Sequence, residues 1–448
     1  MGGSHAPGKR NGMHPRWRSP WTAPPFLTPC CSNSAMSSDR MSSDKAVAYI
    51  TAHYFPERGA PARRARNNVD ALVSAGWDVT VVTQAPHYPQ NLVYDGFGVQ
   101  RVDDRVEAGV RVVRIRPLLV NRRSLPRRLM SELYFAIWTV VIVGRIRPSV
   151  VYSSVPYMFL ASAAIACARL FSVKTVIEFR DLTWLYPRAV GKNTFGLEKI
   201  FEFLIKVALR KADGVVTSTH GQLAYLRRLV GRGWPATVVP TAADQELADK
   251  LSMSPQISGT RRRCRVVYAG LVGFAQRLET YVLAAKRLPD VSFEVYGAGP
   301  ELPTLKRLAA DLKVRNIDFH GHVGEDRLVE TYGSADILVA TLADAPIFEV
   351  TQPSKIWEYM LAGKPVVFSG AGEAAEAVRQ SGGGVVSVPG DARDLAEKVN
   401  LLVKDSELRH RMGQDGRRFV MTQMRPHQVT ATLEPLLDLV RASFPDNG

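Results

Sequence analysis

The chain has 448 residues, of which 46% are hydrophobic and 22% charged, and it contains 34 Gly and 28 Pro. This composition excludes a disordered, collagen-like or disulfide-stapled protein, and the length predicts about two domains, three at most. The net charge of +16 favours anionic partners such as nucleotides, nucleic acid or an acidic membrane surface. Cys30, Cys31, Cys167 and Cys264 are too few and too scattered for a disulfide framework or a zinc site, which favours a reducing cytosol.

Residues 1–44 are rich in Ser, Pro and Gly and show no hydrophobic period, so we expect a disordered tail. Prolines within this tail interrupt every apolar stretch, which argues against a signal peptide. The longest apolar run, Leu133 to Gly144, has twelve residues, whereas a spanning helix needs about 20. We therefore expect a protein that is soluble or bound to one face of a membrane.

From Lys45 onward, short apolar runs alternate with helical patterns. Strands are expected at Ala46–Ala52, Asp78–Thr83, Ser149–Ser153, Thr175–Phe179, Gly214–Ser218 and Ala236–Val239. Helices are expected between them, at Ala62–Ala75, Leu125–Ile146, Tyr157–Phe171, Gly196–Lys211 and Gly221–Val230. Continuous Val/Ile-rich runs indicate a parallel sheet buried on both faces, so residues 45–241 are predicted to form a doubly wound α/β domain.

A polar segment, residues 242–263, interrupts this pattern and is expected to be a linker. Strands are then expected near Arg265–Ala269, Ser292–Tyr296, Asn316–Phe319, Asp336–Ala340, Pro365–Phe368 and Gly384–Val388. They predict a second α/β domain over residues 264–424, and a helix within 425–448 is expected to pack back on the first domain. Two such domains face each other across a cleft, and ligands bind beyond the carboxyl ends of parallel strands.

Candidate site residues follow several of these strands. After the first strand comes Ala52-His53-Tyr-Phe-Pro-Glu-Arg-Gly59-Ala-Pro-Ala-Arg63-Arg64, where Gly59 permits a turn and the next helix points its first N–H groups at the cleft. A purely structural turn is the alternative. His53 and His87 are isolated loop histidines, which more often hydrogen-bond the scaffold than catalyse.

Glycines follow two strands of the second half. Gly270 and Gly273 end the first of these strands, and Gly297 and Gly299 end the next, where they would let a ligand approach the backbone. The usual dinucleotide fingerprint is incomplete, because residues 301–302 stand where its third glycine would be.

The segment from Glu349 to Val367 carries the most chemistry. Pro353 and Ser354 are typical of a helix start. Lys355 falls in the first turn, where a cation opposes the helix dipole unless an anion sits there too. Glu358 projects from nearly the same face, and a Lys for phosphate with a Glu for hydroxyls suits a nucleotide-sugar. A solvated surface pair is the alternative.

In this order, the motifs resemble the family 4 glycosyltransferases of the GT-B fold, above all bacterial members that transfer aminosugars or related sugars in surface-polysaccharide and natural-product pathways. The resemblance covers roughly residues 45–440. Its most specific stretches are His53–Arg64, Ala85–Pro89, Glu178–Leu182, Tyr268–Leu278, Tyr296–Pro300 and Pro353–Val367.

The resemblance implies a hexosyl or aminosugar transferase that uses a nucleotide-diphosphate sugar donor and retains the anomeric configuration. It implies no essential metal and no cofactor. The second half would bind the donor and the first half the acceptor, which would be a sugar, a lipid-linked sugar or a small molecule. Cationic side chains, backbone amides and helix N-termini would then stabilise the leaving diphosphate.

The resemblance also assigns roles to single residues. Glu358 matches the second Glu of the family's Glu-x7-Glu motif, which contacts the donor ribose, whereas Val350 stands at the first position, with Glu349 displaced by one. Leu271 and Gln276 stand where relatives have the Arg and Lys that hold the diphosphate. Arg277 and Lys355 are then the candidates, with Lys355 preferred. The expected donor-binding residues are Gly270, Gly273, Arg277, Gly297, Gly299, Ser354, Lys355 and Glu358.

On the acceptor side, Asp181 would orient or deprotonate the acceptor hydroxyl. Arg180 stands beside it, where many relatives have a His. The expected acceptor-side residues are His53, Gly59, Arg63, His87 and Arg180, and the expected catalytic residues are Asp181, Lys355 and Glu358. No His, Cys and carboxylate cluster has metal-ligand spacing, so no metal site is predicted.

Nine arginines and one acid, Glu132, lie between residues 111 and 150. Arg122, Arg123, Arg127 and Arg128 precede the apolar run, a pattern that suits an anionic membrane surface contacted by residues 122–144. The alternative is a helix that covers the sheet, with solvated arginines. We expect a cytoplasmic protein, peripheral at the inner face of the cell membrane.

Two other functions fit parts of the sequence. A nucleotide-sugar epimerase of the same fold would need paired acids and bases around the donor sugar, and Val350 in place of a Glu weakens that reading. A nucleic-acid-binding protein would explain the charge, but no helix-turn-helix, RNA-binding or zinc signature is present. We therefore expect no nucleic acid partner.

Overall fold

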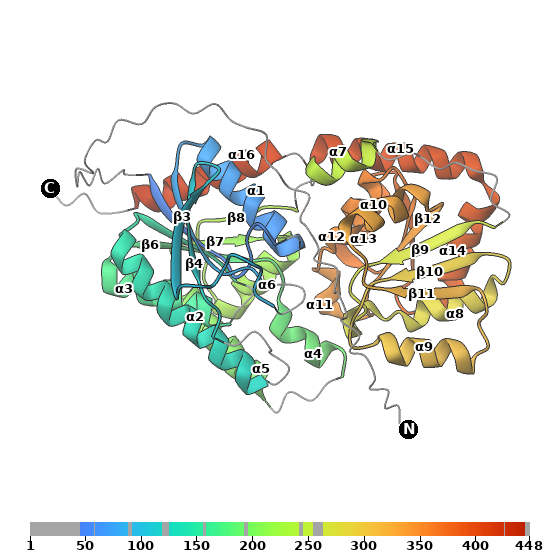
Figure 1. Cartoon of the computed structure of the whole chain (residues 1–448), viewed down its shortest axis with the longest axis horizontal. Helices are drawn as coiled ribbons and strands as arrows, with labels where there is room; N and C mark the ends of the chain where they lie inside the picture. The colour runs from blue at the N-terminus through green and yellow to red at the C-terminus, as the bar shows by residue number, and fades with distance from the viewer. Residues whose placement is uncertain are drawn as a thin grey trace, which may run out of the picture. The chain divides into compact units, whose positions relative to one another are not determined.

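The computed structural model describes residues 45–57, 59–87, 92–118, 125–155, 158–191, 196–241, 245–253, 263–424 and 426–443. The predicted tail, residues 1–44, lies outside these ranges, as do Tyr88, Pro89, Arg122 and Arg123. Within the described ranges the chain forms two parallel-sheet α/β domains, which confirms the predicted fold class (Figure 1).

The N-terminal domain is built on a sheet with the strand order β3-β4-β2-β1-β5-β6-β7-β8. Its strands are β1 (Ala46–Ile50), β2 (Asp78–Gln84), β3 (Val102–Glu107), β4 (Val110–Ile115), β5 (Val150–Val155), β6 (Lys174–Phe179), β7 (Gly214–Thr217) and β8 (Ala236–Val238). All neighbouring strands are parallel except β3 and β4, which form an antiparallel hairpin at one edge.

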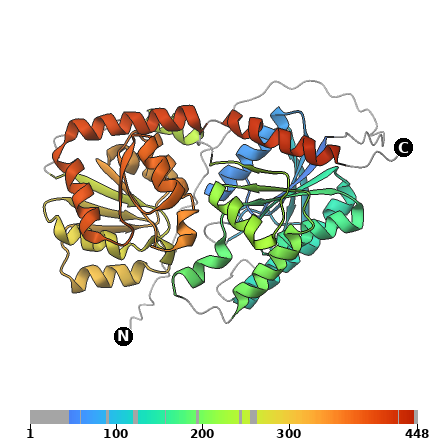
Figure 2. The same ribbon diagram turned by 180° about the vertical axis from the view of Figure 1, so that it is seen from behind.

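Helices cover this sheet on both faces (Figures 1 and 2). They are α1 (Ala60–Ser74), α2 (Leu125–Ile146), α3 (Met158–Phe171), α4 (Tyr186–Ala189), α5 (Leu197–Leu209) and α6 (His220–Val230). Helix α1 packs with α16 (Pro426–Ala442) on one side, and α2, α3 and α5 pack side by side on the other. The buried Val- and Ile-rich strands between them form the core, as expected for a parallel sheet.

The C-terminal domain has the strand order β11-β10-β9-β12-β13-β14. Its strands are β9 (Arg265–Ala269), β10 (Ser292–Tyr296), β11 (Ile317–Gly321), β12 (Ile337–Thr341), β13 (Val366–Ser369) and β14 (Gly384–Ser387). Its helices are α8 (Glu279–Arg287), α9 (Leu302–Asp311), α10 (Glu325–Ser334), α11 (Pro346–Glu349), α12 (Ser354–Leu361), α13 (Gly372–Gln380), α14 (Ala392–Lys404) and α15 (Ser406–Gln423). The strand order reverses between β9 and β12, which places a ligand-binding crevice beyond the end of β9.

Three local features differ from the sequence-based expectations. The hairpin β3–β4 is not predicted, because β3 is polar and largely exposed and therefore lacks a buried apolar run. Helix α7 (Gln245–Met253) lies within the expected linker, and it buries Leu247 and Leu251 against the C-terminal domain. Helix α2 has the predicted bounds, but its apolar stretch, Pro126–Ile146, is longer than the twelve-residue run on which the membrane argument is based.

The length of α2 changes the membrane argument. Its stretch Pro126–Ile146 is long and apolar enough to cross a bilayer by length and composition alone, and 39% of its most apolar window is buried in the protein. The uninterrupted apolar run in the sequence is shorter than this stretch, because Arg127, Arg128 and Glu132 precede it. The helix continues through these charged residues. A helix that covers a sheet passes the same test, and Phe135 and Val143 of α2 are fully buried against the domain.

Helix α16 returns from the end of the C-terminal domain to the N-terminal sheet (Figure 2). Leu433 and Leu437 are fully buried in a cluster with Val47 and Val216 of the sheet. Gly214 allows this approach, because a Cβ there would lie 2.9 Å from the Val440 side chain. The stability of the N-terminal domain therefore depends on the last described helix.

We expect Leu437→Ala to lower the free energy of unfolding of the N-terminal domain by about 2–5 kcal/mol, because it leaves a cavity in this cluster. Leu439 lies on the same helix but is 57% exposed, so Leu439→Ala should change stability by less than about 0.5 kcal/mol. Urea denaturation followed by circular dichroism measures both, and equal effects would contradict the packing of α16.

Candidate functional site

A cavity of about 550 Å³ is lined by residues from both domains, at the carboxyl ends of their strands. From the N-terminal domain, Arg63 and Arg64 reach it from α1, and Arg180 and Asp181 follow β6. From the C-terminal domain come Gly270 after β9 and, on α12, Ser354, Lys355 and Glu358. The position after β9 is the crevice that the strand order predicts.

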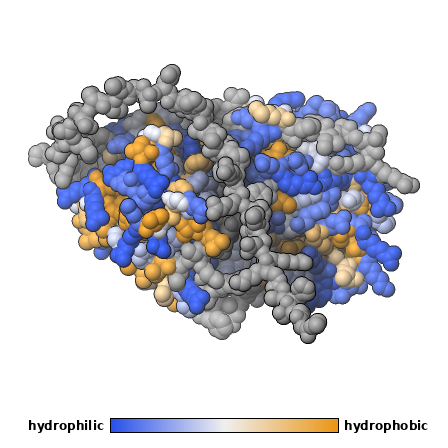
Figure 3. Space-filling view, in the orientation of Figure 1, coloured by the Kyte–Doolittle hydropathy of each residue, from blue (hydrophilic) through white to orange (hydrophobic). Residues whose placement is uncertain are grey.

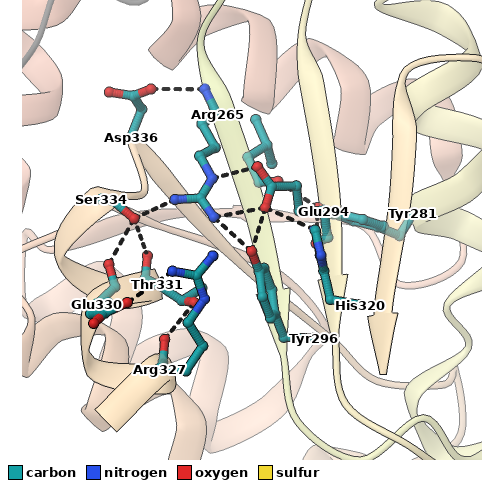
Figure 4. Close-up of polar contacts among 11 residues, drawn as sticks. Arg265, Tyr281, Glu294, Tyr296, His320, Arg327, Glu330, Thr331, Ser334 and Asp336 are labelled. Atoms are coloured by element: carbon teal, nitrogen blue, oxygen red, sulfur yellow. Dashed lines mark hydrogen bonds and ion pairs between the residues drawn. The ribbon is translucent and has the colours of Figure 1, made fainter. Parts of the chain in front are cut away.

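A larger hollow, of about 1200 Å³, lies over the C-terminal sheet and is a weaker candidate. Figure 4 shows why: Arg265 bonds both carboxylate oxygens of Glu294, which also accepts from Tyr296 at 2.7 Å and pairs with His320 at 3.1 Å. Arg327 pairs with Glu330 at 2.8 Å. These charges neutralise one another on the open, polar face of β10 and β11. Within this network of described residues, no charge is therefore left unpaired to indicate a ligand site.

Lys355 is the main cation on the C-terminal wall of the cavity. Its Nζ donates to Tyr268 Oη at 2.5 Å and lies 4.1 Å from the centre of that ring, and Tyr268 Oη in turn donates to the Leu271 carbonyl at 2.6 Å. Removal from water lowers the pKa of Lys355 to about 7, against the opposing charge of Glu358. Within the described part of the chain, Lys355 makes no ion pair, so the first turn of α12 holds a basic side chain with no acidic side chain in contact.

Glu358 lies one turn further along α12 and joins the two domains. It accepts hydrogen bonds from Arg63 of α1 and from Tyr332 Oη at 3.1 Å. The structure thus brings together a residue expected on the donor side and one expected on the acceptor side. Their sequence separation of 295 residues gave no signal for this contact.

A buried ion pair supports the N-terminal wall. Arg64 Nε donates to Glu178 Oε1 at 2.8 Å, and Arg64 Nη2 donates to the Val239 carbonyl at 2.8 Å. Asn68 Nδ2 also donates to Glu178 at 3.1 Å. Burial alone would raise the pKa of Glu178, but Arg64 and Arg180 outweigh it and hold this pKa below its ordinary value. The sequence signal was available, since a Glu within a buried strand needs a cationic partner.

Asp181 follows Glu178 at the end of β6 and lines the cavity. Burial raises its pKa to about 6, although a hydrogen bond with Tyr186 and the charge of Arg180 oppose the shift. Tyr186 Oη also lies 3.1 Å from Thr351 Oγ1, just before α12. The carboxyl of Asp181 is thereby placed in the same cavity as Lys355, with a pKa close to neutrality.

Several expected site residues lie outside the cavity lining. Arg277 is exposed and pairs with Glu279 at 3.8 Å, and Gly273 precedes it in the same loop. A Cβ at Gly297 would lie 1.8 Å from the Gly270 carbonyl oxygen, and one at Gly299 would lie 2.1 Å from that of Val272. These two glycines let the loops after β9 and β10 pack together. They support the loop after β9, which lines the cavity, and do not line the cavity themselves.

The histidines and Gly59 are also outside the lining. His53 Nδ1 lies 2.6 Å from Glu57 Oε2, and the His87 amide donates to Glu57 Oε1 at 2.7 Å. The His87 ring Nδ1 lies 2.9 Å from the Ala85 carbonyl. This carboxylate-centred arrangement holds the loop after β1 in place, and Gly59 is the N-cap of α1, whose next two residues line the cavity.

Sequence reasoning missed a contact between α6 and the C-terminal domain. Val350 stands at the position of the motif's first Glu. Its carbonyl accepts hydrogen bonds from Thr219 Oγ1 at 2.8 Å and from Gln222 Nε2 at 3.1 Å. Glu373 accepts from the amides of Gly221 at 2.5 Å and His220 at 3.0 Å. A Cβ at Gly221 would lie 2.3 Å from the Val350 side chain, so only glycine fits there. Val350 is thus an interdomain contact.

No group of three or more His, Cys, Asp or Glu residues that could hold a metal ion occurs in the part of the chain that the structure describes.

The shifted pKa of Lys355 predicts a pH-dependent stability. Its ordinary pKa is 10.5, so between pH 7 and 10.5 the unfolded chain binds more protons and stability rises with pH. Below pH 7 the folded protein bears the full cost of a desolvated cation. We therefore expect Lys355→Met to raise the melting temperature at pH 6–7 by roughly 2–4 °C, a gain that shrinks toward pH 10.

Differential scanning fluorimetry at several pH values measures this gain. Lys286→Met removes an exposed lysine of α8 and serves as the control, with no change expected at any pH. A lower melting temperature of Lys355→Met at pH 6 would show that Lys355 stabilises the fold.

Comparisons with known proteins agree with this architecture. Residues 59–242 match the family described as "Glycosyl transferase 4-like domain", and residues 262–419 match "Glycosyl transferases group 1". The chain is 24% identical over 337 residues to the sulfoquinovosyl transferase SQD2 of Arabidopsis thaliana, covering 69% of this chain and 60% of that protein. It is 25% identical over 364 residues to the putative colanic acid biosynthesis glycosyl transferase WcaI of Escherichia coli, covering 76% and 86%.

Solved structures share the fold. Sucrose-phosphate synthase from Thermosynechococcus elongatus superposes with a TM-score of 0.70 at 17% identity, covering 89% of this chain and 100% of that one. HepE of Anabaena, in complex with UDP, superposes with a TM-score of 0.64 at 15% identity, covering 88% and 99%. With both halves matched in order, the chain belongs to the family 4 type of glycosyltransferases, which have the GT-B fold.

Proposed function

We propose that this glycosyltransferase moves a hexosyl or aminosugar unit from a nucleotide-diphosphate sugar to an acceptor hydroxyl, with retention of configuration and without a metal or cofactor. The observation that carries the proposal is Lys355, a desolvated cation in the first turn of α12 with no described anionic partner in contact. A diphosphate at this helix start would receive its charge and the free N–H groups of the first turn. Such groups can stabilise a leaving diphosphate without a metal.

The opposite wall supplies a candidate base. In the transfer, the bond from the anomeric carbon to the diphosphate oxygen breaks, and a bond to the acceptor oxygen forms on the same face of the sugar, as retention in a single displacement requires. The acceptor hydroxyl loses a proton, and Asp181, with a pKa of about 6, is mostly ionised at pH 7 and able to accept it. Glu358, steadied by Arg63 and Tyr332, would bind donor hydroxyls.

The names of similar proteins support the proposed substrate class. HepE was crystallised with UDP, and WcaI is named for colanic acid biosynthesis. We propose a nucleotide-sugar donor and a sugar, lipid-linked or small-molecule acceptor of a surface-polysaccharide type of pathway. No observation of the cavity favours an epimerase or a nucleic-acid-binding protein.

The test is a thermal-shift screen with UDP-, GDP- and dTDP-sugars, followed by transfer assays with excess EDTA. A rise in melting temperature with one nucleotide, and EDTA-resistant transfer with an α-linked donor giving an α-linked product, would support the proposal. Transfer that stops with EDTA and returns with magnesium or manganese would overturn its metal-independent part. Absence of any shift and any transfer would overturn the whole.

We expect Lys355→Ala and Glu358→Ala each to lower kcat/KM for the donor by roughly ten- to hundredfold. Each removes charge-assisted hydrogen bonds worth about 1.5–3 kcal/mol. Glu349→Ala is the matched control, because Glu349 is exposed, precedes α12 and does not line the cavity. Steady-state kinetics decide: variants within twofold of wild type would remove Lys355 and Glu358 from the site.

We further propose a cytoplasmic location, peripheral at an anionic membrane face. Helix α2 exposes a stripe of Met130, Leu133, Ile137 and Val141, at 40–56% exposure. Helix α5 adds a second stripe of Ile200, Phe203 and Val207 (42–63% exposed), and Figure 3 shows hydrophobic patches over this side of the N-terminal domain. Arg127, Arg145, Lys199 and Lys206 lie on the same two helices, which suits anionic lipid.

The double variant Ile137→Gln/Phe203→Gln should therefore bind anionic vesicles at least about fivefold more weakly than wild type, because it interrupts both stripes. Leu439→Gln, an equally exposed apolar position on α16, should bind as wild type does. Co-sedimentation with vesicles of phosphatidylcholine alone or with phosphatidylglycerol measures this. Wild type that stays in the supernatant with anionic vesicles would rule the surface out.

A further inference from the structure

Arg180 lines the cavity, but the structure gives its guanidinium no partner there. Nη2 is buried and has no hydrogen-bond partner among the described residues, and Arg180 forms no ion pair with any described carboxylate. A buried donor without a partner destabilises the folded protein, and the cost is larger when the donor is charged. The contacts within the fold therefore do not explain why an arginine occupies this position.

The backbone of Arg180 is held firmly. Its carbonyl accepts from Ser218 Oγ at 2.9 Å and from Gln222 Nε2 at 3.0 Å. Gln222 also bonds the Val350 carbonyl of the C-terminal domain, so the segment is fixed from both sides of the cavity. This anchoring places the guanidinium in the cavity wall.

The charges around Arg180 are already engaged. Glu178 is bonded by Arg64 and Asn68, and Asp181 bonds Tyr186. Burial lowers the pKa of Arg180 even though the charges of Glu178 and Asp181 act to raise it. These neighbours therefore compensate only part of the cost of burying the guanidinium.

The charge balance of the cavity points to a second anion. Its lining includes four cations, Arg63, Arg64, Arg180 and Lys355, and two acids, Asp181 and Glu358. Arg63 is paired with Glu358, and Arg64 with Glu178 beneath the wall. The acid that remains, Asp181, bonds Tyr186 and forms no ion pair with Arg180 among the described residues. A diphosphate at Lys355 and the start of α12 would satisfy one of the two remaining cations. Arg180, on the opposite domain, is left for a different anionic group.

We propose that Arg180 binds a carboxylate, sulfonate or phosphate group carried by one of the two sugar substrates close to the reacting centre. The planar fork of an arginine bonds such groups with two parallel N–H donors, which gives both affinity and orientation. This inference rests on the proposed transferase function and narrows its substrates to those with an anionic sugar on the donor or on the acceptor.

Two arms of one experiment distinguish the sources. The donor arm compares binding of UDP-glucuronate with UDP-glucose, and GDP-mannuronate with GDP-mannose, by isothermal titration calorimetry. The acceptor arm holds the preferred donor constant and compares transfer to glucose 6-phosphate, glucuronate and glucose. Wild type, Arg180→Gln and Arg180→Lys are measured in both arms, with Arg188→Gln, an exposed arginine of α4 outside the cavity, as the control.

We expect wild type and Arg188→Gln to prefer the anionic member of a pair at least tenfold in one arm. Arg180→Gln should reduce this ratio to near one, and Arg180→Lys should leave an intermediate ratio, because it keeps the charge but loses the fork. Binding or transfer with no anionic preference, or a preference that survives Arg180→Gln, would overturn the inference alone. If no nucleotide-sugar binds wild type, the proposed function fails and the inference falls with it.

Discussion

The ion pair between Arg64 and Glu178 is the interaction on which the N-terminal wall of the cavity depends. Both groups are removed from water, and breaking such a pair costs about 3–5 kcal/mol because the remaining charge has no partner. Through it, α1 and β6 are joined, and Arg64 also bonds the Val239 carbonyl just after β8. Tyr49 of β1 and Asn68 of α1 complete the network. The positions of Arg180 and Asp181 follow from the end of β6 that this network fixes.

The two walls of the cavity use burial for different ends. In the C-terminal wall, desolvation leaves Lys355 close to losing its proton, so an arriving diphosphate would restore the charged state. In the N-terminal wall, desolvation raises the pKa of Asp181 to about 6, close to neutral pH, where the carboxylate can exchange a proton with a hydroxyl. Both groups are costly to the folded protein, which is typical of functional sites and untypical of residues that serve the fold.

Much of the fold was predictable from the sequence, because buried parallel strands are continuous apolar runs. The six expected strands of each half are present, and the two domains with them. The hairpin β3–β4 was not predicted because Asp103, Asp104 and Arg105 show no apolar pattern. Helix α7 was not predicted because its short apolar face lies within a polar segment. Both differences are local, and neither the hairpin nor α7 contributes a residue to the cavity lining.

The site was less predictable, because its geometry comes from contacts across long sequence separations. Lys355, Glu358, Ser354 and Gly270 could be found from their local motifs, and all four line the cavity. The pairing of Arg63 with Glu358 could not, and neither could the packing role of Gly297, which only the neighbouring loop reveals. A motif shows which residues gather at a strand end but leaves open which of them face the ligand.

Glu373 has a consequence for the movement of the two domains. Its carboxylate closes the N-terminus of α6, a helix of the other domain, so separating the domains would expose both the free amides of α6 and an unpaired carboxylate. Dissolved anions such as sulfate could then occupy the vacated helix end. Any separation of the two domains would consequently cost less free energy in a buffer rich in such anions, even with no substrate present.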